Sequence, residues 1–252
     1  MKNIWKLFAL IACAALLTTC DEETVQKEMI QFDQAFIPVW YYSHQSQLVL
    51  AERSFYYLED RWQQVEERYL QEQPEDVAFP ESFERVRGWL GDAGQSIREG
   101  NLNNTLIQLD HLRYELMALR RQEDMDYYLD PVWDMEVALF EVVETAQDRM
   151  LQLVDYEAFD CRVEEVFQAW GRVLNAQLDA RLFGWEEVKL ETFRDRQWRL
   201  TSQLAYFREA VACGDGEQFG LEAEQLKAAY LDFIAVFGRF HALPDGFYAE
   251  RN

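Results

Sequence analysis

The chain has 252 residues, with 46 acidic side chains against 24 basic ones and a formal net charge of −22. It contains only 11 glycines and 5 prolines, which is about half of the usual share. A Rossmann-type α/β enzyme or an all-β sandwich needs more of these turn-forming residues, and a nucleic-acid partner requires clustered lysine and arginine. Hydrophobic residues make up 49% of the chain, which excludes a disordered protein.

The N-terminal segment has the organisation of a secretory leader. Lys2 and Lys6 supply a basic start, and an apolar run follows from Leu7 to Leu17. Even as a helix, this run would reach only roughly halfway across a bilayer core, so it is too short to span the membrane. A basic start before a short apolar run is typical of a signal peptide.

The end of this leader, Leu17-Thr18-Thr19-Cys20, resembles the lipobox of bacterial lipoproteins. The resemblance implies that residues 1–19 are removed, that Cys20 is thioether-linked to diacylglycerol, and that the new N-terminus carries a further fatty acid such as palmitate. The alternative is an ordinary secreted leader with a chance cysteine. The formal net charge of −22 becomes −24 once the two leader lysines are removed.

Acidic residues follow the cysteine directly, at Asp21, Glu22 and Glu23. They resemble the surface-export signal of Bacteroidota lipoproteins, whereas an Asp at this place resembles the inner-membrane retention signal of enterobacterial lipoproteins. The expected location is therefore extracytoplasmic and lipid-anchored. The outer membrane, on its periplasmic side or at the cell surface, is the expected site, and the leaflet stays open.

The remainder of the chain has a helical period, with apolar residues at alternating steps of three and four. The stripes are Leu48-Ala51-Phe55-Leu58-Trp62-Val65-Tyr69, Phe83-Val86-Leu90-Ala93-Ile97, Leu102-Thr105-Leu109-Leu112-Leu116-Leu119, Trp133-Val137-Phe140, Val163-Phe167-Trp170-Leu174, Leu190-Phe193-Gln197-Leu200-Leu204-Phe207-Val211 and Leu226-Tyr230-Phe233-Phe237-Phe240. Tyr41 and His44 extend the first stripe toward the N-terminus. The spacing predicts an all-α fold, an antiparallel helical bundle of six or seven helices.

Breaks between the helices are expected at the few prolines and glycines, namely Pro74, Pro80, Gly100, Pro131, Gly184 and Gly214. Asn101 is placed to cap the helix that follows it, and Asp130 with Pro131 is expected to start another. The span from Pro131 to Leu182 fits either one long helix or two helices that part between Asp155 and Asp160.

The order of the predicted helices is repeated at an offset of about 110 to 118 residues. One hypothesis is two tandem related units that share long helices, although helical bundles resemble one another without common origin. The expected organisation is a removed leader (1–19), an acidic tether (20–26), a first helical unit (27–130), and a second helical unit (131–252) packed on the first.

Two cysteines, Cys161 and Cys213, remain after the leader and the anchor. Their midpoint lies near the expected turn at Gly184, so a helical hairpin would bring them to the same end. An extracytoplasmic location permits a disulfide between them, worth roughly 4 kcal/mol for a loop of this length. The alternative is two unpaired, buried small side chains.

The residue patterns of common catalytic and metal sites are absent from the sequence. None of the three histidines follows a glutamate at the Glu-x-x-His spacing of di-iron bundles, and haem-attachment, His-Glu-x-x-His and phosphate-loop motifs are missing. Weak metal candidates are His44 on the first stripe and the i,i+4 pair His111 and Glu115. Their plain alternatives are a buried histidine and a surface pair. No cofactor is expected.

Aromatic residues are unusually clustered. Adjacent positions on a helix point about 100° apart, so consecutive aromatic residues cannot all face one core. We expect some of them to form an interaction surface, the alternative being a thick two-layer core. The candidates for this surface are Trp40, Tyr41, Tyr42, Tyr127, Tyr128 and Trp133.

These observations favour a lipid-anchored, extracytoplasmic helical bundle without catalytic activity, an interaction or scaffold module at the bacterial envelope. Its expected partners are the membrane, through the N-terminal lipid, and an envelope protein; no nucleic-acid partner is expected. The alternative is a bundle that binds a small ligand, haem or a divalent cation in its interior, with His44 and Gln197 as candidate binding residues. An enzyme acting on cell-wall polymers is a more distant third reading.

Overall fold

The computed structural model describes residues 26–72, 78–148, 156–214 and 216–240. Within these ranges the chain is helical and contains no strand, which confirms the predicted all-α fold class. The elements are an N-terminal helix (26–44), α2 (Leu48–Glu72), α3 (Ala78–Arg98), α4 (Leu102–Gln122), α5 (Leu129–Gln147), α7 (Tyr156–Asn175), α8 (Glu187–Cys213) and α9 (Gly216–Ala235).

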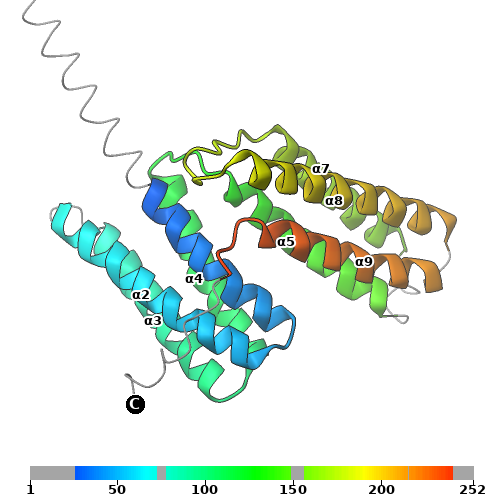
Figure 1. The fold of residues 1–252 in the computed structure, drawn as a ribbon. Coiled ribbons are helices and arrows are strands. Elements are labelled where there is room, and N and C mark those ends of the chain that lie inside the picture. Colours follow the sequence, from blue (N-terminus) through cyan, green and yellow to red (C-terminus); the bar gives the residue numbers. More distant parts are fainter. Residues whose placement is uncertain (1–25, 73–77, 149–155, 215, 241–252) are drawn as a thin grey trace, which may run out of the picture.

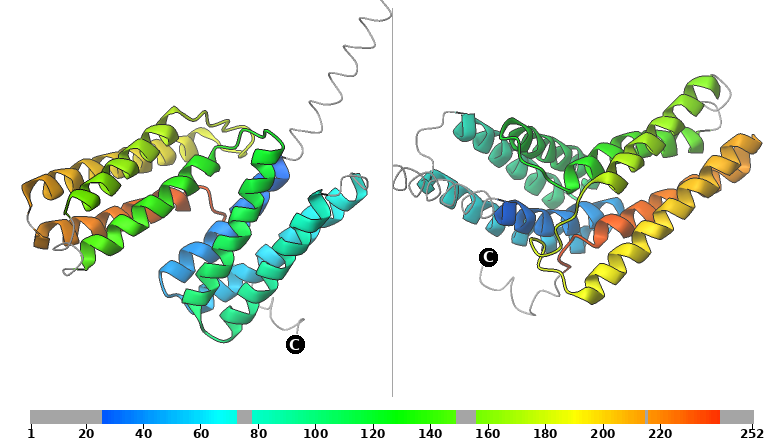
Figure 2. Two further views of the ribbon diagram at one scale, coloured as in Figure 1. Left: turned by 180° about the vertical axis from the view of Figure 1, so that it is seen from behind. Right: turned by 90° about the horizontal axis from the view of Figure 1, so that it is seen from above.

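The eight described helices form two groups that extend away from a shared junction (Figure 1 and Figure 2). The first group holds the N-terminal helix, α2, α3 and α4, and the second holds α5, α7, α8 and α9. Within the groups, α3 packs on α4, α8 on α9, and α5 on both α7 and α9. Each group thus contains four helices in chain order, while a common origin of the two remains a prediction.

The helix count exceeds the expected six or seven because the first stripe belongs to two helices. Tyr41 and His44 lie on the N-terminal helix, and Leu48 begins α2. Between them Ser46 adopts the left-handed conformation (φ 54°). The N–H of Gln47 then donates to the carbonyl of Tyr42 at 2.9 Å, which closes a Schellman motif and ends the helix.

Other helix ends follow the sequence more closely. Gly100, Gly184 and Gly214 have positive φ angles and end helical segments or turns, and the side chain of Asn101 caps α4 by accepting from the N–H of Asn104 at 3.1 Å. The expected cap at Asp130 is wrong, because α5 begins at Leu129 without a side-chain cap.

The described residues of the long span after Pro131 form two helices, α5 and α7, so the alternative of one long helix is wrong. The first of them, α5, ends at Gln147, before the expected break near Asp155. The second, α7, begins at Tyr156 and is helical through Asp160, so the expected position of the break between Asp155 and Asp160 is wrong.

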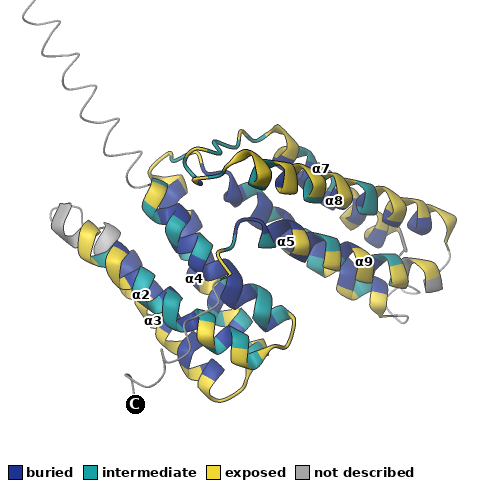
Figure 3. Cartoon of the chain, viewed as in Figure 1, coloured by how far each residue is buried: buried dark blue, intermediate teal, exposed yellow. Residues whose placement is uncertain are grey.

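The core runs without interruption from one group into the other. On the N-terminal helix, Phe32 contacts Trp62 of α2 (ring centroids 5.9 Å apart), and Trp40 contacts Trp133 of α5 (5.5 Å) and Tyr230 of α9 (6.3 Å). Figure 3 shows buried residues along the faces that the helices turn toward one another. The N-terminal helix therefore ties both groups into one hydrophobic core.

The expected disulfide is not formed, and Cys161 and Cys213 are exposed free thiols. Cys161 lies two residues from each of the buried Phe159 and Val163 on α7. Side chains two positions apart on a helix point about 200° apart, so Cys161 faces solvent. The alternative of two buried cysteines is wrong as well.

Candidate functional site

A buried polar network joins the two helix groups. The hydroxyl of Tyr127, between α4 and α5, donates to Oδ2 of Asp33 on the N-terminal helix at 2.6 Å. Nε of Arg120 on α4 donates to Oδ1 of Asp130 on α5 at 3.0 Å. These four residues are at most 8% exposed. Burial raises the pKa of Asp33 to about 6, although Arg120 and the bond from Tyr127 act in the opposite direction.

A second buried ion pair lies nearby and joins the same two helices. Arg113 of α4 pairs with Glu136 of α5, and both are nearly inaccessible to solvent. The guanidinium carbon of Arg113 also lies 4.6 Å from the centroid of the Trp133 ring. Each strongly buried charge in the described part of the chain thus has a protein partner at the junction.

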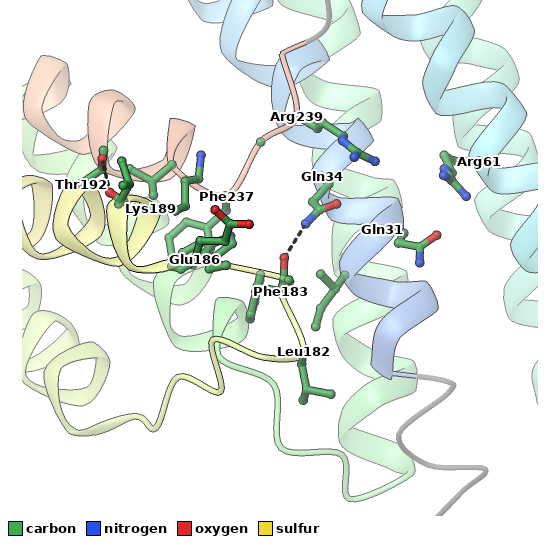
Figure 4. Close-up of a pocket in the computed structure, with 16 residues that line it drawn as sticks. Gln31, Gln34, Arg61, Leu182, Phe183, Glu186, Lys189, Thr192, Phe237 and Arg239 are labelled. Atoms are coloured by element: carbon green, nitrogen blue, oxygen red, sulfur yellow. Dashed lines mark hydrogen bonds between the residues drawn. The ribbon is translucent and has the colours of Figure 1, made fainter.

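A cleft of about 620 Å³ opens where the two groups meet (Figure 4). Its walls come from the N-terminal helix, from α2, from the loop 176–186, from α8 and from the segment 236–239 after α9. The side-chain amide of Gln34 donates to the carbonyl of Phe183 at 3.4 Å, and the N–H of Arg239 donates to the carbonyl of Gln34 at 2.8 Å. These bonds connect opposite walls of the cleft.

A shallower hollow of about 290 Å³ lies on the outer side of α8 and α9. Two large aromatic side chains border it, Trp198 with 68% and Tyr206 with 59% exposure. Arg196 bridges the two helices by pairing with Asp232 of α9 at 2.9 Å. We call Trp198, Ser202 and Tyr206, which follow one another at four-residue steps, the α8 outer face.

The candidate metal ligands are separated from one another. His44 packs between Trp40 and Phe140, and burial, with Lys227 and Arg113 nearby, lowers its pKa to about 3. His111 stacks on Trp89 at 4.4 Å, and Glu115 pairs instead with Arg85 at 2.8 Å. Among the described residues no group of three or more metal-ligating side chains converges.

Most of the candidate aromatic surface is buried, so the expectation of an exposed surface there is wrong. Trp40, Tyr127, Tyr128 and Trp133 are at most 8% exposed and pack at the junction of the two groups. Tyr41 and Tyr42 are half-buried and contact Phe240. The alternative of a thick core describes this cluster better.

Neither the residues of the cleft nor those of the α8 outer face were predicted from the sequence. The α8 outer face could have been found from the sequence, because Trp198 and Tyr206 lie beside the apolar stripe of α8 and not on it. An aromatic side chain off the stripe of an amphipathic helix is expected to be exposed. The cleft had no such signal, since its walls come from five separate segments.

The chain was compared with protein-family models, curated proteins and solved structures. No protein-family model matches the chain, and neither the curated proteins nor the solved structures contain a significant match.

Proposed function

We propose that the chain is a lipid-anchored, extracytoplasmic interaction module of the bacterial envelope, without catalytic activity, that docks an envelope protein on the α8 outer face. The observation that carries the proposal is the exposure of Trp198 and Tyr206 on one helix side. Trp, Tyr and Arg are the residues that dominate binding energy at protein interfaces. Burial of the two rings by a partner removes a large apolar area from water.

The charges around the hollow define the chemistry of the partner. Arg196 and Arg199 are paired with Asp232 and Asp195, so the face is close to neutral in a strongly acidic chain. A basic partner would be drawn to the acidic surface elsewhere. The α8 outer face fits an uncharged segment that presents an apolar side chain to the hollow between Trp198 and Tyr206.

The anchor is supported by the lipobox resemblance at Cys20, which lies outside the described residues. Gln26, the first described residue, follows Cys20 by six positions, which an extended chain spans in about 20 Å. Attachment at Cys20 would hold the start of the N-terminal helix close to the membrane. No described helix is long and apolar enough to cross a bilayer.

Non-catalytic action is supported by the engagement of the buried ionisable groups. Asp33, Arg113, Arg120 and Glu136 have partners across the junction of the two groups. Structural burial and ion pairs perturb pKa values as well, so the raised pKa of Asp33 does not by itself indicate catalysis.

Site-specific photo-crosslinking in intact cells tests the docking. A photoreactive residue is placed at position 198 or 206, and at Ile107 of α4 as a control that is 53% exposed in the other group. We expect one and the same adduct from positions 198 and 206, and none from 107. Equal adducts from all three positions would contradict a specific docking face.

Mass spectrometry of the membrane fraction tests the anchor separately. We expect a diacylglycerol-modified peptide that begins at Cys20, and release of the Cys20→Ser protein from the membrane. An unmodified Cys20 in the soluble fraction of the wild type would overturn the anchoring.

A second candidate function is the binding of a small ligand, which the cleft between the two groups favours. The cleft lies at the surface of the junction and not in the interior of a bundle.

A further inference from the structure

The cleft contains three basic side chains that lack a carboxylate partner among the described residues. They are Arg61 of α2, Lys189 of α8 and Arg239 after α9. Most of the described arginines form ion pairs with Asp or Glu, as expected for a chain with a large excess of acid. Basic side chains that gather without such partners in an acidic chain indicate a site for an external anion.

Figure 4 shows how these groups divide the cleft into two ends. Arg61 and Arg239 lie at the end formed by the N-terminal helix and α2, together with the amides of Gln31 and Gln34. Lys189 lies at the α8 end with Glu186 and Thr192. The first end is purely basic and amide-lined, whereas the second contains charges of both signs.

Arg61 is held in place by neutral partners. Its Nε donates to the hydroxyl of Tyr57 at 3.2 Å, and its Nη1 donates to Oε1 of Gln64 at 2.6 Å. These bonds restrict the guanidinium group, and neither partner carries a charge. A preorganised guanidinium loses less side-chain entropy when it binds a carboxylate or phosphate.

Three aromatic rings, those of Phe183, Trp185 and Phe237, also line the cleft. Trp185 lies 5.2 Å from Phe183 and 5.1 Å from Phe237, measured between ring centroids. Phe183 and Phe237 are buried, while Trp185 is half-buried and is the ring that a ligand can reach. Trp185 thus offers a flat apolar surface inside the cleft, close to Phe193 of α8.

We propose that the cleft binds a small organic anion in which a carboxylate or phosphate is attached to a ring. Arg61 and Arg239 hold the anionic group, Gln31 and Gln34 add hydrogen bonds, and the ring packs on Trp185. The mixed charges of Lys189 and Glu186 favour a neutral polar group, such as a hydroxyl, at the opposite end of the ligand. This site is separate from the α8 outer face, and either can fail without the other.

Calorimetric titration of the full mature chain tests the proposal with two charged probes and their uncharged counterparts. Phenyl phosphate is compared with phenol, and glucuronate with glucose. We expect at least one charged probe to bind at least tenfold more tightly than its counterpart. The result also distinguishes an aromatic phosphate from an acidic sugar as the source of the anion.

Variants assign the binding to the cleft. The double variant Arg61→Gln/Arg239→Gln should bind the charged probe at least tenfold more weakly, because the charge-assisted hydrogen bonds of both arginines are lost. Trp185→Leu should also weaken it, while Arg98→Gln on the exposed side of α3 should leave the affinity within twofold. Unchanged thermal melting shows that the variants fold. Equal binding of charged and uncharged probes, or unchanged affinity in the double arginine variant, overturns the proposal.

Discussion

Two neighbouring arginines on α4 form ion pairs that differ in burial. Arg120 is 2% exposed and binds Asp130 across the junction, whereas the side chain of the adjacent Arg121 is 55% exposed and pairs with Asp134 at the surface. One step along a helix turns a side chain by about 100°. The sequence shows two consecutive arginines, and only the packing of α5 distinguishes them.

Replacement of these two arginines should therefore have unequal effects. Arg120→Gln leaves Asp130 buried without its partner, and we expect a loss of about 3–5 kcal/mol in the free energy of unfolding. Arg121→Gln removes an exposed pair and should cost less than about 1 kcal/mol. Urea unfolding of both variants measures the difference, and equal losses would contradict the structural role of the buried pair.

Asp33 should make stability depend on pH in an unusual direction. Because burial raises its pKa from 3.8 to about 6, the folded state favours the protonated carboxyl. The stability that the protonated Asp33 contributes to the folded state is fully present below pH 3.8 and is lost as the pH rises through 6. A shift of this size corresponds to about 3 kcal/mol.

The Asp33→Asn variant isolates this effect from the other acids of the chain. Asparagine does not titrate, so the free energy of unfolding of the variant should rise by about 2 kcal/mol relative to that of the wild type between pH 4 and pH 7. Unfolding free energies at both pH values provide the measurement. If the difference in unfolding free energy between variant and wild type stays constant or falls with rising pH, the pKa of Asp33 is not raised in the folded protein.

At the scale of the helix, the apolar stripes predicted where helices form but not always where they end. Gly100 and Gly214 mark their breaks because glycine favours the left-handed conformation. Ser46 and Asp124 adopt the same conformation without such a signature, which is why the first break was missed. Val137 and Leu174 were placed in core stripes but are about half exposed, since three or four residues of a short stripe do not locate its centre.

Two glycines of similar appearance in the sequence should respond oppositely to alanine. Gly100 has a φ of +73°, so Gly100→Ala should destabilise the protein by about 1–2 kcal/mol. Gly91 is exposed within α3 with open space around it, so Gly91→Ala should stabilise by up to about 1 kcal/mol. Thermal unfolding of the two variants provides the test. Destabilisation by Gly91→Ala would contradict its open position within α3, and an unchanged stability of Gly100→Ala would contradict the assigned helix end.

At the scale of the whole molecule, the two groups are joined through the N-terminal helix, and their junction creates the cleft. The fold class followed from the periodicity, because each helix buries one stripe. The cleft could not be predicted, since Gln34, Arg61 and Arg239 approach one another only after both groups are packed. The α8 outer face is local to one helix and could have been identified from Trp198 and Tyr206.

The central claim is that the chain docks an envelope protein on the α8 outer face. The most direct test is the affinity of the purified chain for the partner that crosslinks to position 198. Trp198→Ala should weaken binding by about thirtyfold, which corresponds to a hot-spot contribution of about 2 kcal/mol. Ile107→Ala, a control at the other helix group, should change it less than twofold. Wild-type affinity in the Trp198→Ala protein would contradict the account.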